Sequence, residues 1–306
     1  MDVDVYSVLD FFLTDKATTT CETYLQVFRL FLQFLDGRCP YLIEICDIWA
    51  FHSYLKKRKG IKARADNSDD FSRRTIIKYF SILRAIYKYF VSVKLVKNNH
   101  FDRPEFHFKE RKVSEKRPTE AVQFSLVKKI VKAPKGTLKQ DIRNRAMLTT
   151  FFAAGIRRND LRCLRLHDVR WTDTGLLWLK LRATKGGGDK IQPMPEWSHD
   201  AIRKLYDQRI LESATPQDFL FTGYTRDQRT QNGQMDPKTI WTLFRRFSGH
   251  SPHDARATGI TRLLQMGFTY RQVQEFSGHG SVAMIERYDK TRIDTESHIG
   301  KKLNFD

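Results

Sequence analysis

Apolar side chains recur at steps of three and four residues in the first hundred residues, and this spacing constrains the fold more than any other feature of the sequence. The repeat runs through Thr20–Asp36 and Ser72–Val93, and a shorter stretch is Ile45–Lys57. One face of an α-helix returns about every 3.6 residues, so each stretch predicts a helix with one apolar face. We therefore expect a helical domain over residues 1–98.

The opposite face of the Ser72–Val93 stretch is strongly basic. Its cations are Arg73, Arg74, Lys78, Arg84 and Lys88. Such a face is either a solvated surface or a surface laid against phosphates, and the spacing alone leaves both interpretations open.

Residues 99–118 interrupt the helical period. They are polar and charged and contain Pro104 and Pro118, which predicts a linker between two domains. The cations that would let this linker run along a polyanion are Arg103, Lys109, Arg111, Lys112, Lys116 and Arg117.

The rest of the chain, residues 119–306, combines two periods. Helical spacing predicts a helix over Phe124–Val131 and another over Asp141–Ala154, which Gly155 ends. Gly175–Pro195 instead alternates apolar and polar residues, which is typical of a β-hairpin. The expected fold class is mainly α, with a helical first domain and a mixed α+β second domain that contains a small hairpin or sheet.

The composition favours a globular protein with a polyanionic partner. Apolar residues make up 41% and charged residues 29%, and the formal net charge is +19. Nucleic acid is the commonest partner of so basic a chain, although RNA and acidic membranes also attract basic proteins. The four cysteines form no C-x-x-C pair, the amino terminus is acidic, and no run of about 18 apolar residues occurs. We expect a cytoplasmic protein with reduced thiols, without a metal site or a membrane span.

Two short motifs place arginines where a phosphate could be held. In AGIRRNDL, Arg157 follows Gly155 at the start of a new helix, and Asp160 is either a first-turn acid or a residue that orients an arginine. In SPHDAR, a capping box opens a helix that carries His253 and Arg256 on one face.

A third motif, FSGHGSVAMIERY, closes the second domain. A short helix ends at Gly278, His279 follows in the turn, and Ser281 is expected to cap a helix that carries Tyr288. Each motif alone is compatible with an ordinary structural role, so the weight lies in their conjunction on one basic domain.

In this order, and with ATKGGG around Lys185 between the first and second motifs, the segments resemble the tyrosine recombinases, also called the phage integrase family. The catalytic domain of that family typically reads T-G-[LM]-R, a T-K-G hairpin, H-x-L-R, L-G-H and a final Tyr. The corresponding segments here read AGIR, ATKGGG, HDAR, SGH and IERY. The resemblance is clear over Thr119–Tyr288 and looser over Tyr6–Asn98, which is similar to a helical core-binding domain.

Four positions depart from the family pattern without removing a catalytic group. Ala154 and Ala255 stand for the usual Thr and Leu, Ala257 for a second His, and Ser277 for a Leu. The departures indicate a divergent member, which we expect a mobile element to encode.

The resemblance implies DNA cleavage and rejoining by transesterification, with no metal, cofactor or ATP. Tyr288 would attack the phosphate and form a 3′-phosphotyrosine, and Arg157 and Arg256 would stabilise charge on the phosphate oxygens. His253 would accept the tyrosine proton, and Lys185 would protonate the leaving 5′-oxygen.

The same resemblance gives supporting roles to two further residues. His279 would donate a hydrogen bond to the phosphate, and Asp160 would support the site from behind. Two alternatives remain open: a type IB topoisomerase, which nicks and reseals DNA without exchanging partners, and a family member that binds DNA without cleaving it.

The expected partners are double-stranded DNA core sites with inverted half-sites and further copies of the chain. The protein resembles the two-domain recombinases that lack an arm-binding domain, so we expect a monomer when free and a homo-tetramer on DNA, associated with the nucleoid. The tail at 292–306 contains Ile293, Ile299, Leu303 and Phe305. This apolar tail must be buried either on its own domain or on a neighbouring copy.

Overall fold

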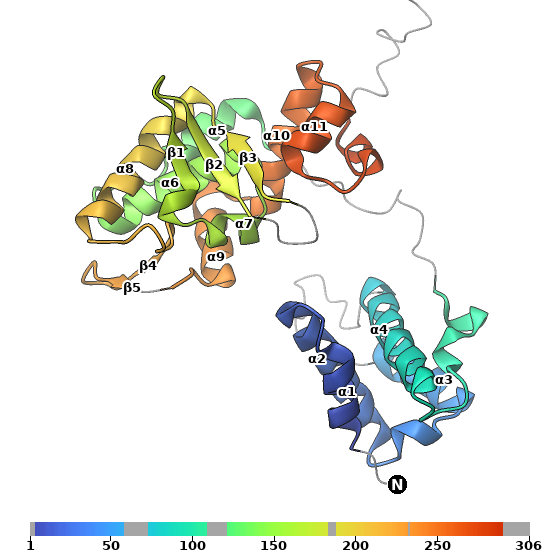
Figure 1. Cartoon of the computed structure of the whole chain (residues 1–306). Helices are drawn as coiled ribbons and strands as arrows, with labels where there is room; N and C mark the ends of the chain where they lie inside the picture. The colour runs from blue at the N-terminus through green and yellow to red at the C-terminus, as the bar shows by residue number, and fades with distance from the viewer. Residues whose placement is uncertain (1–3, 58–72, 109–120, 183–187, 232, 290–306) are drawn as a thin grey trace, which may run out of the picture. The chain divides into compact units, whose positions relative to one another are not determined.

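The computed structural model describes residues 4–57, 73–108, 121–182, 188–231 and 233–289 (Figure 1). The chain divides into two compact units, Met1–Lys116 and Arg117–Asp306, and each is described by itself. Lys185, Arg111, Lys112 and the tail at 292–306 lie outside the described residues.

The described part of the first unit is helical. Its elements are α1 (Val5–Leu13), α2 (Thr18–Leu35), η1 (Pro40–Leu42), α3 (Ile45–Lys57), α4 (Arg73–Ser92), η2 (His100–Asp102) and η3 (Pro104–Phe106). The bounds of α2, α3 and α4 lie within two residues of those that the apolar repeat predicts. Helix α1 was not expected; the Asp4 carboxylate caps it by accepting hydrogen bonds from the backbone N–H groups of Tyr6 and Ser7.

Aromatic rings fill the core of this unit. Phe31 of α2 lies with its ring centroid 4.8 Å from that of Phe51 in α3 and 5.5 Å from that of Phe101 in η2. Phe80 of α4 is 5.7 Å from Phe101 on the same measure. One ring from the segment after α4 therefore joins α2 and α4.

This packing moves the end of the first unit beyond the expected boundary at residue 98. Phe101 and Phe106 are both fully buried in the first core, so residues 100–106 are part of this unit and not of a linker. The prolines and the loss of helical period predict a linker here, because two single anchoring rings leave no periodic signal.

Arg84 differs from the expectation of a DNA-facing cation. Its guanidinium donates hydrogen bonds to the carbonyl oxygens of Phe101, at 3.1 Å, and Phe106, at 3.0 Å, and it lies 3.4 Å from a carboxylate oxygen of Asp102. These contacts fasten the segment after α4 to the helix. Lys78 and Lys88 of the same basic face are exposed.

The second unit is a mixed α+β domain. Its helices are α5 (Phe124–Val131), α6 (Lys139–Ala154), α7 (Arg158–Cys163), α8 (His199–Leu211), α9 (Pro237–Ser248), α10 (Pro252–Gln265) and α11 (Tyr270–Ser277). Its strands are β1 (Val169–Trp171), β2 (Leu177–Leu181), β3 (Lys190–Pro193), β4 (Gly223–Tyr224) and β5 (Thr230–Gln231). Its short 3-10 turns are η5 (Leu166–Asp168), η6 (Glu196–Ser198), η7 (Val282–Met284) and η8 (Glu286–Tyr288).

The expected hairpin is present as part of a three-stranded antiparallel sheet in the order β1-β2-β3 (Figure 1). Lys190 pairs with Leu181 at the end of β2, and Leu179 pairs with both Val169 and Gln192. Helix α6 contacts α5, α7, α8 and α10 and buries residues on all its sides. A helix surrounded in this way forms the centre of a domain.

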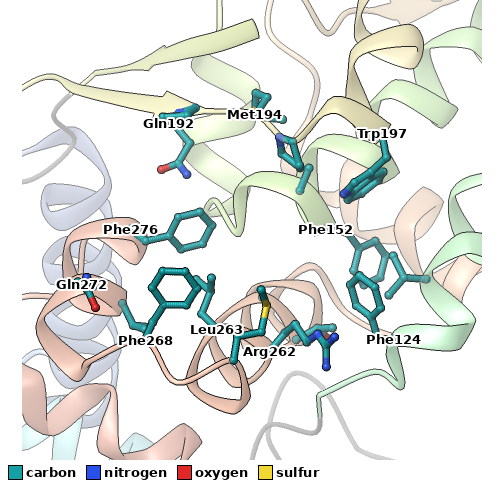
Figure 2. A pocket seen from close by; sticks show the side chains of 18 residues that line it. Phe124, Phe152, Gln192, Met194, Trp197, Arg262, Leu263, Phe268, Gln272 and Phe276 are labelled. Carbon is teal, nitrogen blue, oxygen red and sulfur yellow. The ribbon is translucent and has the colours of Figure 1, made fainter. Parts of the chain in front are cut away.

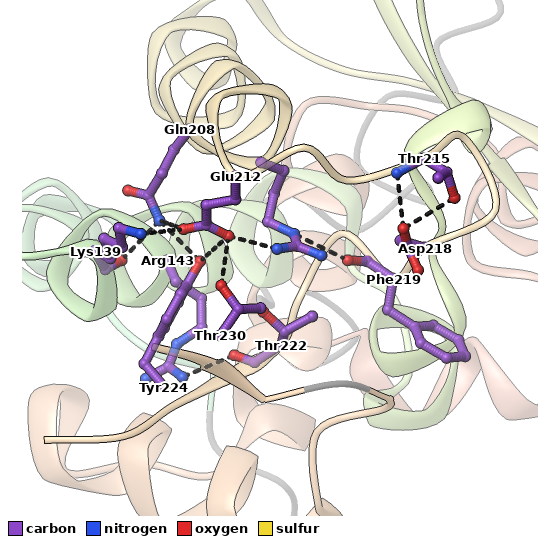
Figure 3. A network of polar contacts seen from close by, with 11 residues as sticks. Lys139, Arg143, Gln208, Glu212, Thr215, Asp218, Phe219, Thr222, Tyr224 and Thr230 are labelled. Atoms are coloured by element: carbon purple, nitrogen blue, oxygen red, sulfur yellow. Dashed lines mark hydrogen bonds and ion pairs between the residues drawn. The ribbon is translucent and has the colours of Figure 1, made fainter. Parts of the chain in front are cut away.

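A buried polar network holds the β4–β5 hairpin beside α8 (Figure 3). The Glu212 carboxylate accepts hydrogen bonds from the Arg209 guanidinium and from Thr230 Oγ1, the latter at 2.9 Å. Lys139 Nζ lies 3.4 Å from the other carboxylate oxygen. Burial alone would raise the pKa of Glu212, but the hydrogen bonds and charges of these partners lower it. The network is thus built around an ionised carboxylate.

Across the residues that the structure describes, no helix is both long and apolar enough to cross a bilayer.

Candidate active site

The three motifs meet in the second unit, where the carboxyl ends of α6 and α11 approach α10. Gly155 and Gly278 end these two helices with φ angles of 56° and 63°, the left-handed conformation that glycine adopts most readily. The last carbonyls of a helix have no partner within the helix. Both ends therefore present free acceptors to α10.

Arg256 of α10 binds both helix ends. Only 3% of its surface is exposed, and its guanidinium donates to the carbonyl oxygen of Gly155 at 2.8 Å and to that of Ser277. Burial and the nearby charge of Arg157 lower the pKa of Arg256 to about 10. The side chain therefore remains cationic at neutral pH and is held from two directions.

Arg157 is the N-cap of α7 and is exposed. Its backbone N–H donates to the Asp160 carboxylate at 2.9 Å, and its guanidinium donates to the carbonyl oxygen of Gly278 at 2.9 Å. Asp160 is thus a first-turn acid that also fixes the backbone from which Arg157 extends. This contact is with the backbone of Arg157, so a role of Asp160 in orienting an arginine side chain stays a prediction.

His279 lies beside Arg256, and only 7% of its surface is exposed. Its Nδ1 is 2.7 Å from Ser277 Oγ and 3.3 Å from a terminal nitrogen of Arg256. Burial, followed by the charges of Arg256 and Arg157, lowers the pKa of His279 to about 4. At neutral pH the ring is an uncharged imidazole, which can still donate one hydrogen bond.

Tyr288 lies next to His279, with 6.0 Å between the ring centroids. The tyrosine is partly buried against a small cluster formed by Ile260, Val273 and Ile285. Burial raises its pKa, although the charges of Arg256 and other arginines act in the opposite direction. The phenol is therefore protonated at neutral pH and needs a base before it can attack.

The segment that carries Tyr288 differs from the expected helix capped by Ser281. It consists of two 3-10 turns, η7 and η8, and the Ser281 side chain makes no capping hydrogen bond. Ile285, between the two turns, packs with Ile260 of α10 and Val273 of α11. Each turn is too short to show the apolar repeat by which a helix is predicted.

His253 and Arg256 share one face of α10, as their spacing predicts. His253 lines a cavity of about 310 Å³ together with Arg157, Arg256 and Trp241. Part of its ring faces solvent, but desolvation by the surrounding protein, followed by the charge of Arg256, lowers its pKa. His253 is consequently neutral near pH 7 and able to accept a proton.

A model of the phage integrase family matches residues 121–293, more than half of the chain. The chain belongs to the phage integrase family. It is a DNA breaking and rejoining enzyme of the tyrosine recombinase type, as the motifs indicated.

Curated relatives and solved structures agree with this membership. The chain is 25% identical over 285 residues to a tyrosine recombinase XerA of Thermococcus kodakarensis, covering 89% of this chain and 90% of the relative. It is 29% identical to a tyrosine recombinase XerC of Bacillus pumilus, covering 73% and 72%.

Two solved structures share the fold. The integrase of transposon Tn1549, solved with circular intermediate DNA, has a TM-score of 0.65 at 16% identity and covers 97% of this chain and 98% of its own. The recombinase XerH, in its post-cleavage complex, has a TM-score of 0.65 at 15% identity and covers 92% and 80%.

The structure adds to this integrase site two residues that the motifs did not reveal, Lys190 and Trp241. Lys190, the first residue of β3, donates a hydrogen bond from Nζ to the carbonyl oxygen of Phe276. Trp241 of α9 is 39% exposed and lines the cavity beside His253. Lys190 stands opposite the buried Leu181 in the sheet, and the sequence alone does not specify this register.

The expected general acid, Lys185, belongs to the segment 183–187, which lies outside the described residues. Among the residues described, no group of three or more His, Cys, Asp and Glu side chains is arranged to hold a metal ion. The positive charges gathered around the described site include Arg157, Arg256 and Lys190.

Proposed function

We propose that this integrase is a site-specific recombinase that exchanges strands between two DNA duplexes through a Holliday junction, with Tyr288 as the nucleophile. The observation that carries the proposal is the position of Tyr288. Its ring lies beside His279 and close to the charges of Arg256 and Arg157, all on one chain. A phosphate bound by the two arginines would thus lie near the phenol of the same copy.

Two guanidiniums suit the pentacoordinate phosphorus of the transition state because each offers several fixed donors and remains charged at any working pH. In the described site Arg157 uses one terminal nitrogen on a carbonyl and is exposed, so it has donors left for a ligand. Arg256 is anchored by both terminal nitrogens, which fixes the plane of its guanidinium. Such fixed donors stabilise the charge that develops on non-bridging oxygens without reorganising during the reaction.

The proposed proton transfers follow from the pKa directions. Tyr288 Oη attacks the phosphorus while its proton passes to His253, which is neutral because its pKa is lowered. The bond from phosphorus to the 5′-oxygen breaks, and we assign the proton that this oxygen receives to Lys185. His279, also neutral, donates a hydrogen bond to a non-bridging oxygen. Attack by a 5′-hydroxyl of the partner duplex reverses these steps, so no external energy source is consumed.

DNA is the proposed substrate along both units. Relatives named as tyrosine recombinases and an integrase solved with circular intermediate DNA support it. On the first unit we propose phosphate contacts from Arg73, Arg74, Lys78 and Lys88, and also from Arg111 and Lys112, which lie outside the described residues. Arg84 is left out because its guanidinium binds the protein's own carbonyls.

Four copies are needed when two duplexes, each with two inverted half-sites, exchange strands, and we propose a homo-tetramer on DNA formed from free monomers. An apolar groove in the second unit offers a docking place (Figure 2). It has a volume of about 640 Å³, and its lining includes Phe124, Phe152, Met194, Leu263, Phe268 and Phe276.

We propose that the apolar tail at 292–306 of a neighbouring copy fills this groove. Deleting residues 292–306 should abolish cooperative binding to a DNA with two half-sites, because the groove would lose its occupant. A variant with Ile299→Ser and Leu303→Ser keeps the length of the tail and controls for truncation. Unchanged cooperativity and unchanged tetramer formation in both variants would show that the tail is not an assembly element.

A nicked suicide substrate separates the proposal from its alternatives. The wild type should form a covalent protein–DNA adduct and join strands from two duplexes, while Tyr288→Phe should bind DNA and form no adduct. Adduct without strand exchange would indicate a topoisomerase, and binding without adduct a protein that only binds DNA. We further propose a cytoplasmic, nucleoid-associated role for a mobile element, which inverted repeats beside the gene would support.

A further inference from the structure

The end of α11 is held by cations from three separate elements. Three successive carbonyl oxygens each accept a hydrogen bond from a different positively charged side chain. The pairs are Lys190 with Phe276, Arg256 with Ser277, and Arg157 with Gly278. His279, which lies beside Tyr288, follows directly in the chain.

This arrangement has a simple electrostatic reason. The carboxyl end of a helix carries partial negative charge on carbonyls that lack an intrahelical partner, and it attracts cations. Two arginines and a lysine would repel one another if brought together without compensation. The carbonyls, together with the Asp160 carboxylate, supply that compensation.

Of the three cations, Lys190 has no role in the proposed chemistry. Burial, followed by the charge of Arg256 on α10, lowers the pKa of Lys190 to about 8; Arg157 of the α7 cap also lowers it, and Asp160 of α7 raises it. Its Nζ lies 5.5 Å from the ring centroid of Phe276. The lysine lies here although desolvation makes its charged form unfavourable.

We propose that Lys190 is a positioning residue for DNA cleavage. By binding the Phe276 carbonyl, it fixes the end of α11 from the side of the sheet. This sets the place of the carbonyls that hold Arg256 and Arg157, and of His279 beyond them. The inference rests on the proposed roles of the two arginines and Tyr288.

A pH dependence follows from the contacts of Lys190. Its ammonium binds the carbonyl through a charge-assisted hydrogen bond, which is stronger than the bond a neutral amine can make. As the pH rises through about 8 the ammonium loses its proton, so the end of α11 is held less firmly. The cleavage rate should therefore fall above that pH.

The fold should not be lost over the same range. The pKa of Lys190 is lower in the folded chain than its ordinary value of 10.5, so the unfolded state holds the proton more tightly. Between these two values this group makes the folded state more stable as the pH rises. A cleavage rate that falls above pH 8 while the melting temperature does not would thus show that Lys190 acts by positioning and that the fall is not caused by unfolding.

Three variants of the full chain test the inference by single-turnover cleavage of a nicked substrate across the pH range. Lys190→Met should slow cleavage about 10²-fold with little change in DNA affinity, because displaced catalytic groups react poorly. Lys190→Arg should restore most of the rate and abolish the fall above pH 8, because arginine does not titrate there. Lys180→Met is the matched control, since Lys180 is on the same sheet and pairs with Asp189 at 2.9 Å.

Several results would overturn the inference. One is a Lys190→Met variant whose cleavage rate and pH profile equal those of the wild type. If Tyr288→Phe still forms no adduct in the same assay, the proposed function stands and only the role of Lys190 is refuted. Another is rescue of Lys190→Met by a 5′-bridging phosphorothiolate, because that substrate replaces a general acid and not a positioning residue. If Lys190→Met does not fold, the pH profile of Lys190→Arg decides, and an unchanged alkaline fall in it refutes the role of Lys190.

Discussion

Arg256 and Arg157 should respond very differently to removal, although both are assigned to the same phosphate. Arg256 is buried and joins the ends of α6 and α11, whereas Arg157 is exposed and makes one contact with Gly278. Arg256→Ala should therefore damage both stability and catalysis. Arg157→Ala should damage catalysis alone.

The magnitude for Arg256→Ala follows from its two carbonyl partners. A buried polar group left without a hydrogen bond costs about 1–3 kcal/mol, so the carbonyls of Gly155 and Ser277 together account for about 2–6 kcal/mol. Removing a desolvated cation that lies near Arg157 offsets part of this loss. We expect a net decrease of about 2–4 kcal/mol in the free energy of unfolding. For a unit of this size that lowers the melting temperature by roughly 4–16 °C.

Thermal unfolding followed by tryptophan fluorescence measures this effect, because Trp49 is the only tryptophan outside the second unit. Arg157→Ala should shift the same transition by less than about 1 kcal/mol, since water replaces its single exposed bond. Both variants should lose on the order of 10² or more in cleavage rate. Equal melting temperatures for the two variants would refute the structural role of Arg256. A wild-type cleavage rate in either variant would show that the substituted arginine does not bind the phosphate.

Three further predictions concern proton transfer, stability and DNA binding. The cleavage rate should fall as the pH drops through the lowered pKa of His253, below about 6.5, and His253→Gln should lose this acid limb; a limb near pH 4 would indicate His279 instead. Glu212→Gln should lower the free energy of unfolding at pH 7 by about 1–3 kcal/mol, because it weakens the bonds from Arg209 and Thr230. Because folding lowers the pKa of Glu212, its carboxylate stabilises the fold above about pH 4.5, and this stabilisation is lost as the pH falls through the pKa of the folded state. The free energies of unfolding of the wild type and Glu212→Gln should therefore converge in acid, and a constant difference between them would contradict this. DNA affinity should fall steeply between about 50 and 200 mM salt, and Lys88→Ala should reduce the slope of that dependence, whereas a salt-independent Kd would exclude a large phosphate interface.

Much of the local structure follows from the sequence because its signals are short in range. The apolar repeats identified α2, α3 and α4, and the glycines at 155 and 278 marked the ends of α6 and α11. The capping box of Ser251 and Asp254 opens α10 as expected. Each of these signals acts within about one turn of a helix, so a single stretch of sequence contains it whole.

The segment after α4 shows where such signals end. Its prolines and charges indicated a linker, but Phe101 and Phe106 are buried and their carbonyls hold Arg84. Nothing in the spacing of the basic face separates Arg84 from Lys88, which is exposed. Arg84 differs from Lys88 because it binds the carbonyls of Phe101 and Phe106, which lie about 20 residues away in the chain.

The sequence alone indicated the family, the order of the motifs and the residue types of the site, because each motif is a short stretch that contains its side chains whatever surrounds it. The tertiary structure alone decided what holds them in place. It brings β3 to the end of α11, so that Lys190 binds Phe276 across 86 residues, and it places two arginines on the last carbonyls of helices far apart in the chain. Those contacts depend on the register of a hairpin and the packing of α6, α10 and α11, and no local pattern specifies either.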